Sequence, residues 1–472
     1  MSEKIKVAVS QQEMEEQKQY IDALKSRILN TGLQYHIVTY GCQMNVHDSE
    51  KLAGMLNDIG YEETSQQQEA DLVLFNTCCV RENAELKVYG NIGALKAYKM
   101  ANPNMIIGVC GCMMQQTDVS DYIVKRFPFV DLVFGTHNLH HFPSLLLQAF
   151  DSTQTIVEIL DSEGDVVEHI PTKRSLGISA WVTVMYGCNN YCSYCIVPYV
   201  RGRERSRQPQ DILEEISKLV ADGYKEITLL GQNVNSYGKD LEDKYLFHDL
   251  LREIDKLQGI ERVRFMTSHP KDLSPELISA LSECSKLCEH LHLPIQSGSN
   301  RVLKAMNRKY TREDYMELVE KLRAAVPGIA LTTDIIVGFP GETEEEFLDT
   351  LDIMKRIEYD SAYTFIYSPR TGTPAAKISN QISQEVKKER LSRLIDLQNE
   401  ISKKKNAAYK DREVEVLVEG PSKNKHEIMS GRTRTNKLVN FAASPNLIGQ
   451  LVKVKIIGTR SWTLEGKEEK ND

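Results

Sequence analysis

The chain has 472 residues, of which 41% are hydrophobic and 26% are charged, and its formal net charge is −8. This composition is typical of a folded protein of two to four domains, and it excludes a disordered chain, a collagen and a coiled-coil rod. No apolar stretch approaches the roughly 18 to 20 residues that span a bilayer. The charged start of the chain contains no apolar signal core. We therefore expect a cytoplasmic protein without a membrane segment.

The first 150 residues predict a small α/β domain preceded by an arm. Residues 1–33 are charged, and we expect a charged helix or a disordered arm there, with no assigned function. Over residues 34–150, short apolar runs such as YHIVTYGC, DLVLFNTC and MIIGVCGC alternate with helical periods, which predicts a parallel α/β sheet. Residues 151–175 are polar and acidic, and we expect them to form a linker.

A second, larger α/β region is predicted over residues 176–404. Amphipathic helical stretches separate its candidate strands, which are AWVTVMYG, EITLLGQNV, RVRFMTSH, HLHLPIQ, LTTDIIVG and AYTFIYSP. Six β/α units with right-handed crossovers favour an open or partial barrel, and five or seven units fit the pattern as well. A highly charged helical stretch follows at about residues 381–410. Residues 405–472 alternate short strands with turns and predict a small, OB-like, five-stranded β-barrel.

The strongest motif has three cysteines, Cys188, Cys192 and Cys195, directly after the first strand of the predicted barrel. Three thiols at these spacings can hold one 4Fe–4S cluster, and they leave its fourth iron open to an outside chelator. A structural zinc site would need a fourth protein ligand, and no other Cys or His lies within fifteen residues on either side. The motif therefore predicts an iron–sulfur cluster with an open coordination position.

A second set of cysteines, Cys42, Cys78 and Cys112, ends three predicted strands at separations of 36 and 34 residues. Each separation is about the length of one βα unit. The three thiols should therefore meet at the carboxyl edge of one parallel sheet, where such folds place their ligands. We interpret them as the ligands of a second open cluster; the alternative is three buried strand-end thiols. The remaining cysteines are interpreted as buried thiols: Cys79, Cys110, Cys284 and Cys288.

The CxxxCxxC motif resembles that of the radical S-adenosylmethionine enzymes, and a series of ordered motifs over residues 34–468 resembles the radical methylthiotransferase family. These motifs are YGCQMNVHDSE, NTCCVRENA, GCMMQQ, GCNNYCSYCIVPYVRGRERSR, GQNVNSYG, HLPIQSGS, DIIVGFPGET and SPRTGTPA. YGCQMN, NTC-x-VRE and GRTRTNKLVNF are similar to the branch that modifies tRNA, the 2-methylthio-dimethylallyladenosine synthases. The C-terminal region is similar to a TRAM domain, which is an RNA-binding β-barrel.

The resemblance implies two 4Fe–4S clusters and two molecules of S-adenosylmethionine per turnover, one as methyl donor and one as the source of a 5′-deoxyadenosyl radical. It also implies transfer of a methylthio group to carbon 2 of an adenosine beside the tRNA anticodon. A reductant protein such as a flavodoxin or ferredoxin would be the partner, and we expect a monomer. By resemblance, Tyr194 lies beside the adenine of the cofactor. The amino, carboxylate and ribose groups of the cofactor would be held by Gln232, Asn233, Gln296, Ser297 and Asp334. Each of these five could instead be an ordinary turn residue, and the GFPG turn at 338–341 departs from the superfamily pattern.

Two basic segments predict contacts with RNA. Residues 410–460 carry ten Lys or Arg against five Asp or Glu, which is typical of a phosphate-binding face. The candidate contacts in this segment are Arg432, Arg434, Lys437 and Phe441. A second basic run follows the CxxxCxxC motif, with Arg201, Arg203, Arg205 and Arg207. A solvated basic face that pairs with Glu204 is the alternative for this run.

Two alternatives remain open beside the tRNA methylthiotransferase. One is the same chemistry on another substrate, either threonylcarbamoyladenosine in tRNA or a ribosomal-protein side chain. The other is a non-catalytic, zinc-containing RNA-binding protein that uses the same thiols. Iron and sulfide analysis separates the latter, because two cubes contain about eight irons and a zinc protein contains none.

Overall fold

The structure is a computed structural model that describes residues 11–79, 82–160, 166–174, 177–423 and 425–469. The chain forms two compact units. Unit 1 comprises Met1–Leu176, Met185–Asn189 and Ile196–Arg207, and unit 2 comprises Gly177–Val184, Asn190–Cys195 and Gln208–Asp472. Among the described residues, no helix is long and apolar enough to cross a membrane.

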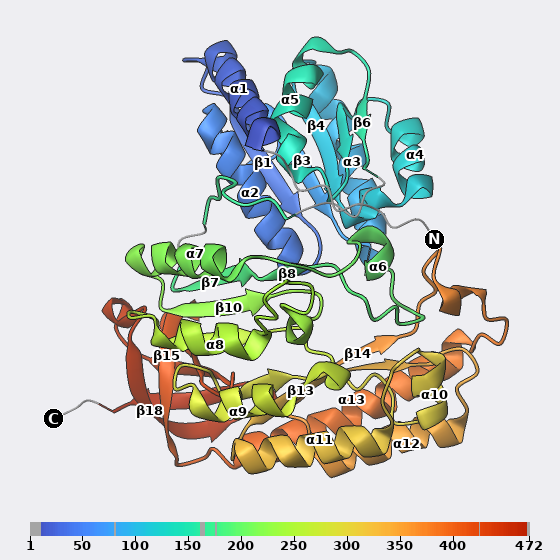
Figure 1. The fold of residues 1–472 in the computed structure, drawn as a ribbon, viewed down its shortest axis with the longest axis vertical. Coiled ribbons are helices and arrows are strands. Elements are labelled where there is room, and N and C mark those ends of the chain that lie inside the picture. The colour runs from blue at the N-terminus through green and yellow to red at the C-terminus, as the bar shows by residue number, and fades with distance from the viewer. Residues whose placement is uncertain (1–10, 80–81, 161–165, 175–176, 424, 470–472) are drawn as a thin grey trace. The chain divides into compact units, whose positions relative to one another are not determined.

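Unit 1 contains a six-stranded parallel sheet in the order β2-β1-β3-β4-β5-β6 (Figure 1). Its strands are β1 (Gln34–Thr39), β2 (Glu62–Glu63), β3 (Leu72–Thr77), β4 (Ile106–Gly111), β5 (Leu132–Phe134) and β6 (Ile156–Glu158). Every residue of β3 and β4 is buried, as expected for parallel strands that are covered on both faces. The predicted parallel α/β sheet is confirmed.

Helices cover both faces of this sheet, namely α1 (Gln11–Ile28), α2 (Gln43–Ile59), α3 (Glu82–Ala101), α4 (Thr117–Arg126) and α5 (Phe142–Asp151). Successive strand residues point to opposite faces. Leu72 and Leu74 accordingly pack with residues of α1, α2 and α5, whereas Val73 and Phe75 pack with residues of α3 and α4. Short elements complete unit 1: η1 (Cys112–Gln115), η2 (Leu139–His141), α6 (Val197–Val200) and an antiparallel pair, β8 (Met185–Tyr186) with β9 (Arg205–Ser206).

Two segments of unit 1 carry more structure than the sequence pattern indicates. Part of the expected linker is the edge strand β6, which pairs in parallel with β5, because its short β-branched run can use the free backbone groups of that edge. Residues 161–165 and 175 of the linker lie outside the described residues. In the N-terminal arm, α1 buries Ile21, Leu24 and Ile28 against the sheet, while residues 1–10 lie outside the description.

Unit 2 begins with two three-stranded parallel sheets, β11-β10-β7 and β12-β13-β14. The strands are β7 (Ser179–Thr183), β10 (Glu226–Leu230), β11 (Arg262–Phe265), β12 (His290–His292), β13 (Ala330–Val337) and β14 (Ser361–Ile366). An isolated parallel bridge between Val263 and Leu287 lies between the two sheets. The six strands coincide with the six predicted ones, so the partial barrel is confirmed.

Helices between these strands make each connection a crossover, as parallel pairing requires. They are α7 (Pro209–Ala221), α8 (Phe247–Lys256), α9 (Pro275–Glu283), α10 (Asn300–Ala305), α11 (Arg312–Ala325) and α12 (Glu344–Ile357), with η3 (Val234–Ser236), η4 (Pro270–Asp272) and η5 (Pro374–Lys377) in the loops. The charged helical stretch is α13 (Gln384–Ala407).

A closed five-stranded barrel in the order β15-β16-β17-β19-β18 ends unit 2 (Figure 1). Its elements are β15 (Glu413–Ser422), β16 (Lys425–Thr433), β17 (Leu438–Ala442), η6 (Pro445–Leu447), β18 (Leu451–Thr459) and β19 (Leu464–Glu468). Alternate residues of its strands, such as Val416 and Val418, fill a small apolar core. The predicted C-terminal β-barrel is confirmed.

Candidate iron–sulfur and cofactor sites

Three cysteines follow three neighbouring strands of unit 1. Cys42 precedes the first turn of α2 after β1, Cys78 follows the last residue of β3, and Cys112 begins η1 directly after β4. Because β1, β3 and β4 are adjacent and parallel, their carboxyl ends lie along one edge of the sheet. A side chain at Gly41 would place its Cβ 2.6 Å from the Cβ of Cys78. The loop that carries Cys42 therefore runs against the end of β3.

Burial and nearby charges set the state of the Cys112 thiol. Cys78 and Cys112 are buried, with 2% and 5% exposure, whereas Cys42 is exposed. Burial raises the pKa of Cys112 to about 12; the positive charge of Arg201 opposes this rise, and the charges of Cys78 and Cys42 add to it. The three cysteines thus share one edge of the sheet, and three thiols are a suitable donor set for an iron–sulfur cluster.

Arg201 lies within this cysteine site rather than on a basic surface. Its Nε donates a hydrogen bond to the Sγ of Cys112 at 3.0 Å, and its Nη2 donates to Asp48 at 2.7 Å. The side chains of Arg201 and Asp48 are only 6% and 9% exposed. Burial alone would lower the pKa of Arg201, but the negative charges of Asp48 and the cysteines raise it well above its usual value.

Two buried asparagines connect the loops that carry the cysteines, and neither is among the residues predicted from the sequence. Asn45 donates to the side-chain oxygen of Asn76 and to the carbonyl of Thr77, each at 3.1 Å. Asn76 donates in return to the carbonyl of Asn45 at 2.8 Å. The Sγ of Cys42 donates to Oδ1 of Asn45 at 3.4 Å. The sequence signal that could have identified them is their position in the motifs YGCQMN and NTC, close to Cys42 and Cys78. Val80 and Arg81 of the second motif lie outside the described residues.

The four other cysteines are all buried. Cys110 packs in the core between the sheet and α2, and Cys79 packs with Ile196 and Val200. Cys284 and Cys288 are 6% and 3% exposed, and α9 ends at Glu283 before either of them. The two cysteines are therefore not on consecutive turns of α9.

The CxxxCxxC loop contributes residues to both units. Cys188 belongs to unit 1, where its backbone N–H donates to the carbonyl of Gly202 at 3.1 Å. Cys192 and Cys195 belong to unit 2, where a turn brings the N–H of Cys195 within 2.9 Å of the carbonyl of Cys192. Arg308, 7% exposed, donates from Nη1 to the Sγ of Cys192 at 3.4 Å. A buried guanidinium thus contacts one sulfur in each cysteine set.

The aromatic residue of this loop, Tyr194, is partly buried in unit 2. It packs against an apolar cluster that includes Phe339 and Tyr367. Burial raises the pKa of its hydroxyl well above the usual value, with a contribution from the charge of Cys192. The ring is therefore held in place by neighbouring side chains.

The predicted cofactor-binding residues follow or lie on the barrel strands of unit 2. Gln232 and Asn233 follow β10, and Nδ2 of Asn233 donates to Asp272 at 2.8 Å. Gln296, at a positive φ of 72°, follows β12, and its N–H donates to the carbonyl of Asp334 at 2.9 Å. Oδ2 of Asp334 lies 3.4 Å from Nε2 of His292.

Ser297 differs from the other candidates because it is completely buried. Its hydroxyl lies 3.5 Å from that of Thr350 on α12, and a Cβ at the adjacent Gly298 would lie 2.4 Å from the carbonyl oxygen of Asp349. This position supports the close packing of the loop against α12.

Several buried polar atoms at the carboxyl edge of β10 and β11 have no hydrogen-bond partner within the described part of the chain. They are Oδ1 of Asn233, Oδ1 of Asn235 and Oγ of Ser268, and their residues are 1%, 6% and 5% exposed. Buried acceptors without partners are costly unless a ligand satisfies them. This set suits the amino and ribose hydroxyl groups of S-adenosylmethionine, so the residues present fit that cofactor.

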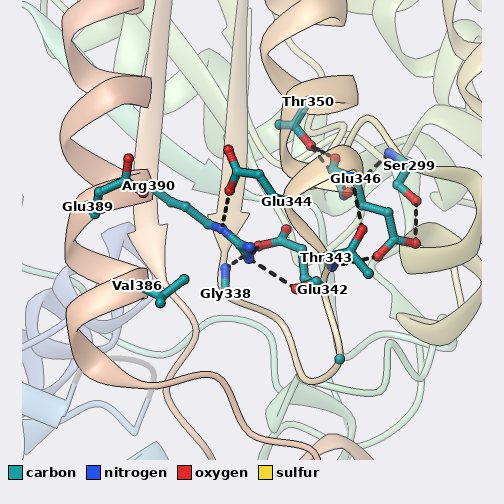
Figure 2. A network of polar contacts seen from close by, with 12 residues as sticks. Ser299, Gly338, Glu342, Thr343, Glu344, Glu346, Thr350, Val386, Glu389 and Arg390 are labelled. Atoms are coloured by element: carbon teal, nitrogen blue, oxygen red, sulfur yellow. Dashed lines mark hydrogen bonds and ion pairs between the residues drawn. The ribbon is translucent and has the colours of Figure 1, made fainter.

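The GFPG turn is locked by side chains rather than open to a ligand (Figure 2). Glu342, 3% exposed, accepts from the N–H of Gly338 at 2.7 Å and from Nη1 of Arg390 on α13 at 2.8 Å. Thr343 caps α12 by accepting from the N–H of Glu346 at 3.3 Å. The positive φ of 70° at Gly338 serves this turn.

The predicted RNA contacts separate into engaged and exposed residues. Arg434 forms a two-nitrogen contact with Glu289 at 2.8 Å, and Lys437 pairs with Asp360 at 2.8 Å. Phe441 is 2% exposed in the core of the C-terminal barrel, so its ring is not presented to a base.

The remaining basic candidates differ in exposure. Arg205 and Arg207 are 8% and 6% exposed, and Arg207 pairs with Glu168 at 2.6 Å. Arg203 is exposed, and the side chain of Arg432, 38% exposed, pairs with Glu419 at 3.1 Å. Among these RNA candidates, Arg203 and Arg432 are therefore the most accessible.

Comparison with protein-family models identifies three matching regions. Residues 34–135 match the uncharacterized protein family UPF0004, residues 182–354 match the Radical SAM superfamily, and residues 407–467 match the TRAM domain. Among solved structures, the radical S-adenosylmethionine methyltransferase TsrM from Kitasatospora setae, with cobalamin and a [4Fe-4S] cluster bound, has a TM-score of 0.53 at 15% identity. The match covers 73% of this chain and 77% of that one. This likeness concerns the fold.

Curated relatives match almost the entire chain, and they carry the name tRNA-2-methylthio-N(6)-dimethylallyladenosine synthase. The relative from Acetivibrio thermocellus is 59% identical over 98% of this chain and 97% of its own length. The relative from Alkaliphilus oremlandii is 58% identical over 99% of both chains, and that from Clostridium tetani is 59% identical over 92% and 96%. The chain therefore belongs to the family of tRNA-2-methylthio-N(6)-dimethylallyladenosine synthases.

Proposed function

We propose that the chain is a tRNA methylthiotransferase that attaches a methylthio group to carbon 2 of dimethylallyladenosine beside the anticodon. The observation that carries the proposal is the presence of two three-cysteine sets in one chain, Cys42, Cys78 and Cys112 at one sheet edge and Cys188, Cys192 and Cys195 in one loop. The names of the full-length relatives supply the substrate.

The reaction requires chemistry that side chains alone do not provide, because the hydrogen on carbon 2 of adenine is not usefully acidic. Two 4Fe–4S clusters and S-adenosylmethionine would supply radical hydrogen abstraction and the methylated sulfur when bound. The protein then has to hold these groups, orient the base and exclude water. The six cysteines are the proposed cluster ligands.

The two buried arginines are proposed to position the cysteine ligands. Arg201 donates to the sulfur of Cys112 and is itself held by Asp48. Arg308 donates to the sulfur of Cys192 and to the carbonyl of Pro294. A hydrogen bond from a cation to a ligating sulfur lowers the electron density on that sulfur and fixes its direction, which tunes the reduction potential of a bound cluster.

The unpartnered acceptors of Asn233, Asn235 and Ser268 are proposed to bind the polar groups of S-adenosylmethionine. Asn233 has its Nδ2 committed to Asp272, which turns its Oδ1 into a fixed acceptor. Tyr194 is proposed to lie beside the adenine, and Gln232, Gln296 and Asp334 to complete the site. Ser297 would not contact the cofactor but would support the packing of its own loop against α12.

Recognition of tRNA is proposed to use exposed arginines and the C-terminal barrel. Arg203 and Arg432 are the accessible basic candidates, and each phosphate contact adds to a salt-dependent affinity. The target adenine has to leave its stack to reach an enzyme site, which costs least in a single-stranded loop. We further propose a cytoplasmic monomer that receives electrons from a flavodoxin or ferredoxin.

Nucleoside mass spectrometry of tRNA tests the proposal. A deletion strain should lose 2-methylthio-dimethylallyladenosine, and the wild-type gene should restore it, whereas Cys112→Ala should not. Cys284→Ala is the matched control, since it also truncates a buried cysteine but lies outside both sets. Unchanged nucleoside levels in the deletion strain would refute the proposal, and loss of methylthio-threonylcarbamoyladenosine or of a modified ribosomal-protein residue instead would assign the alternative substrates.

Iron and sulfide analysis of the anaerobically reconstituted protein tests the cofactors independently of the substrate. Two cubes require about eight irons per chain. Cys112→Ala and Cys192→Ala should each lower the iron content by about half. Zinc at both sites, with no iron or sulfide, would identify the RNA-binding zinc protein.

A further inference from the structure

We propose that Glu13, His140 and His141 of unit 1 form a zinc site that fastens the first turn of α1 to the sheet domain. One carboxylate and two imidazoles come together here from segments more than 120 residues apart. Their ligand atoms all lie within 4.8 Å of one another. This set is separate from both cysteine sets.

The distances between the donor atoms suit a tetrahedral ion. Oε1 of Glu13 lies 3.4 Å from Nε2 of His140 and 2.8 Å from Nε2 of His141. With zinc–nitrogen and zinc–oxygen distances of about 2.0–2.1 Å, neighbouring ligands of a tetrahedral zinc lie roughly 3.3 Å apart. The two distances from Glu13 therefore lie within about half an ångström of this spacing, and the two imidazole nitrogens lie within 4.8 Å of each other. Two His and one carboxylate are a known zinc donor set, in which the fourth position takes water.

The hydrogen bonding of His141 directs its other nitrogen toward the proposed ion. Nδ1 of His141 lies 2.6 Å from Oε1 of Glu158, and Asn138 donates to the same oxygen at 2.9 Å. A proton on Nδ1 leaves a lone pair on Nε2, which then faces the carboxylate oxygen of Glu13. Two acceptors at 2.8 Å repel each other unless a proton or a cation lies between them. A carboxylate behind a ligating histidine is also the usual support of a zinc site.

The charges and the packing of α1 favour a divalent ion at this position. The carboxylates of Glu13 and Glu158 together balance the charge of one Zn²⁺. The buried apolar contacts of α1 come from Ile21, Leu24 and Ile28, so they anchor its later turns only. A metal bridge from Glu13 to η2 would fix the first turn of α1. The side chain of Glu13 is 35% exposed, so an ion from solvent can reach the site.

Zinc binding to the full-length, tag-free chain tests this inference. The two clusters are reconstituted first so that the cysteines are occupied, loosely bound metal is removed with EDTA, and Zn²⁺ is titrated by calorimetry with elemental analysis after gel filtration. We expect one zinc per chain with a dissociation constant in the micromolar range or tighter. Hydrogen exchange at the start of α1 should slow when zinc is added.

Three variants separate the site from adventitious binding. His140→Ala/His141→Ala should abolish this zinc, and Glu158→Gln, which keeps the size of the side chain, should weaken it about 10- to 100-fold. His248→Ala is the control, because His248 also lies beside a carboxylate, that of Asp249, but belongs to no three-ligand cluster among the residues that the structure describes. Iron content identifies variants that fail to fold. Equal zinc binding by wild type and the double variant would overturn the proposal. It would also be overturned if wild type bound no zinc, in which case Glu13 and His141 share a proton instead of an ion.

Discussion

Replacing Arg201 by methionine should loosen the segment that follows the CxxxCxxC motif. In the wild type, Nη2 of Arg201 lies 2.7 Å from the carboxylate of Asp48. The substitution removes this buried cation and leaves the carboxylate, whose side chain is 9% exposed, without its charged partner. Breaking a buried ion pair by removing one partner costs about 3–5 kcal/mol. At about 1.4 kcal/mol per power of ten, local opening should become roughly 100- to several-thousand-fold more frequent.

Hydrogen exchange followed by mass spectrometry measures this opening directly. Peptides from residues 196–207 and from η1 should exchange faster in Arg201→Met by that factor. The double variant Arg201→Met/Asp48→Leu should recover much of the protection, because an apolar pair of similar size often replaces a buried ion pair at little cost. Arg203→Met is the matched control on an exposed neighbour.

Two results would refute this reasoning. Exchange in Arg201→Met within about threefold of wild type would mean that the pair does not hold the segment. A double variant that is less protected than the single variant would mean that Asp48 contributes through other contacts. In the first case Arg201 would not be the positioning residue for Cys112, and the auxiliary iron content of Arg201→Met should then match that of wild type.

Three further predictions follow from single positions. Gly187→Ala should lower iron loading, because its Cβ would lie 1.9 Å from the carbonyl oxygen of Arg203; Gly223→Ala, also at positive φ but with no atom within 4 Å, should retain full loading. Burial, aided by nearby cations, lowers the pKa of His269 to about 2. In the unfolded chain this histidine takes up a proton near pH 6.5, so the free energy of unfolding should fall by about 2 kcal/mol as the pH is lowered from 6.5 to 5. The same pH dependence of urea unfolding in His269→Gln would contradict this. Arg203→Ala should reduce the salt dependence of tRNA binding by about one phosphate contact, whereas Arg434→Ala should not, and equal slopes for wild type and Arg203→Ala would exclude the contact.

Local pattern predicted much of the fold because burial on both faces and βα spacing are encoded in neighbouring residues. The six barrel strands and four strands of unit 1, β1, β3, β4 and β5, coincide with apolar runs of the chain. The placement of Cys42, Cys78 and Cys112 at one edge follows from the same regularity, since each crossover of a parallel sheet returns the chain to the same side. Their role as cluster ligands remains a prediction.

The residue pattern predicted most strands and helices, with β2 and β6 as exceptions, whereas the contacts of each polar side chain depend on how distant segments pack. Arg201 and Phe441 belong to basic segments that the sequence predicts to contact RNA. In the structure, Arg201 is buried against Asp48 and Phe441 lies inside a β-barrel. Glu13 and His141 are far apart in the chain but meet at 2.8 Å. Periodicity reports the face on which a residue lies, but it carries no information about partners that packing brings from distant segments.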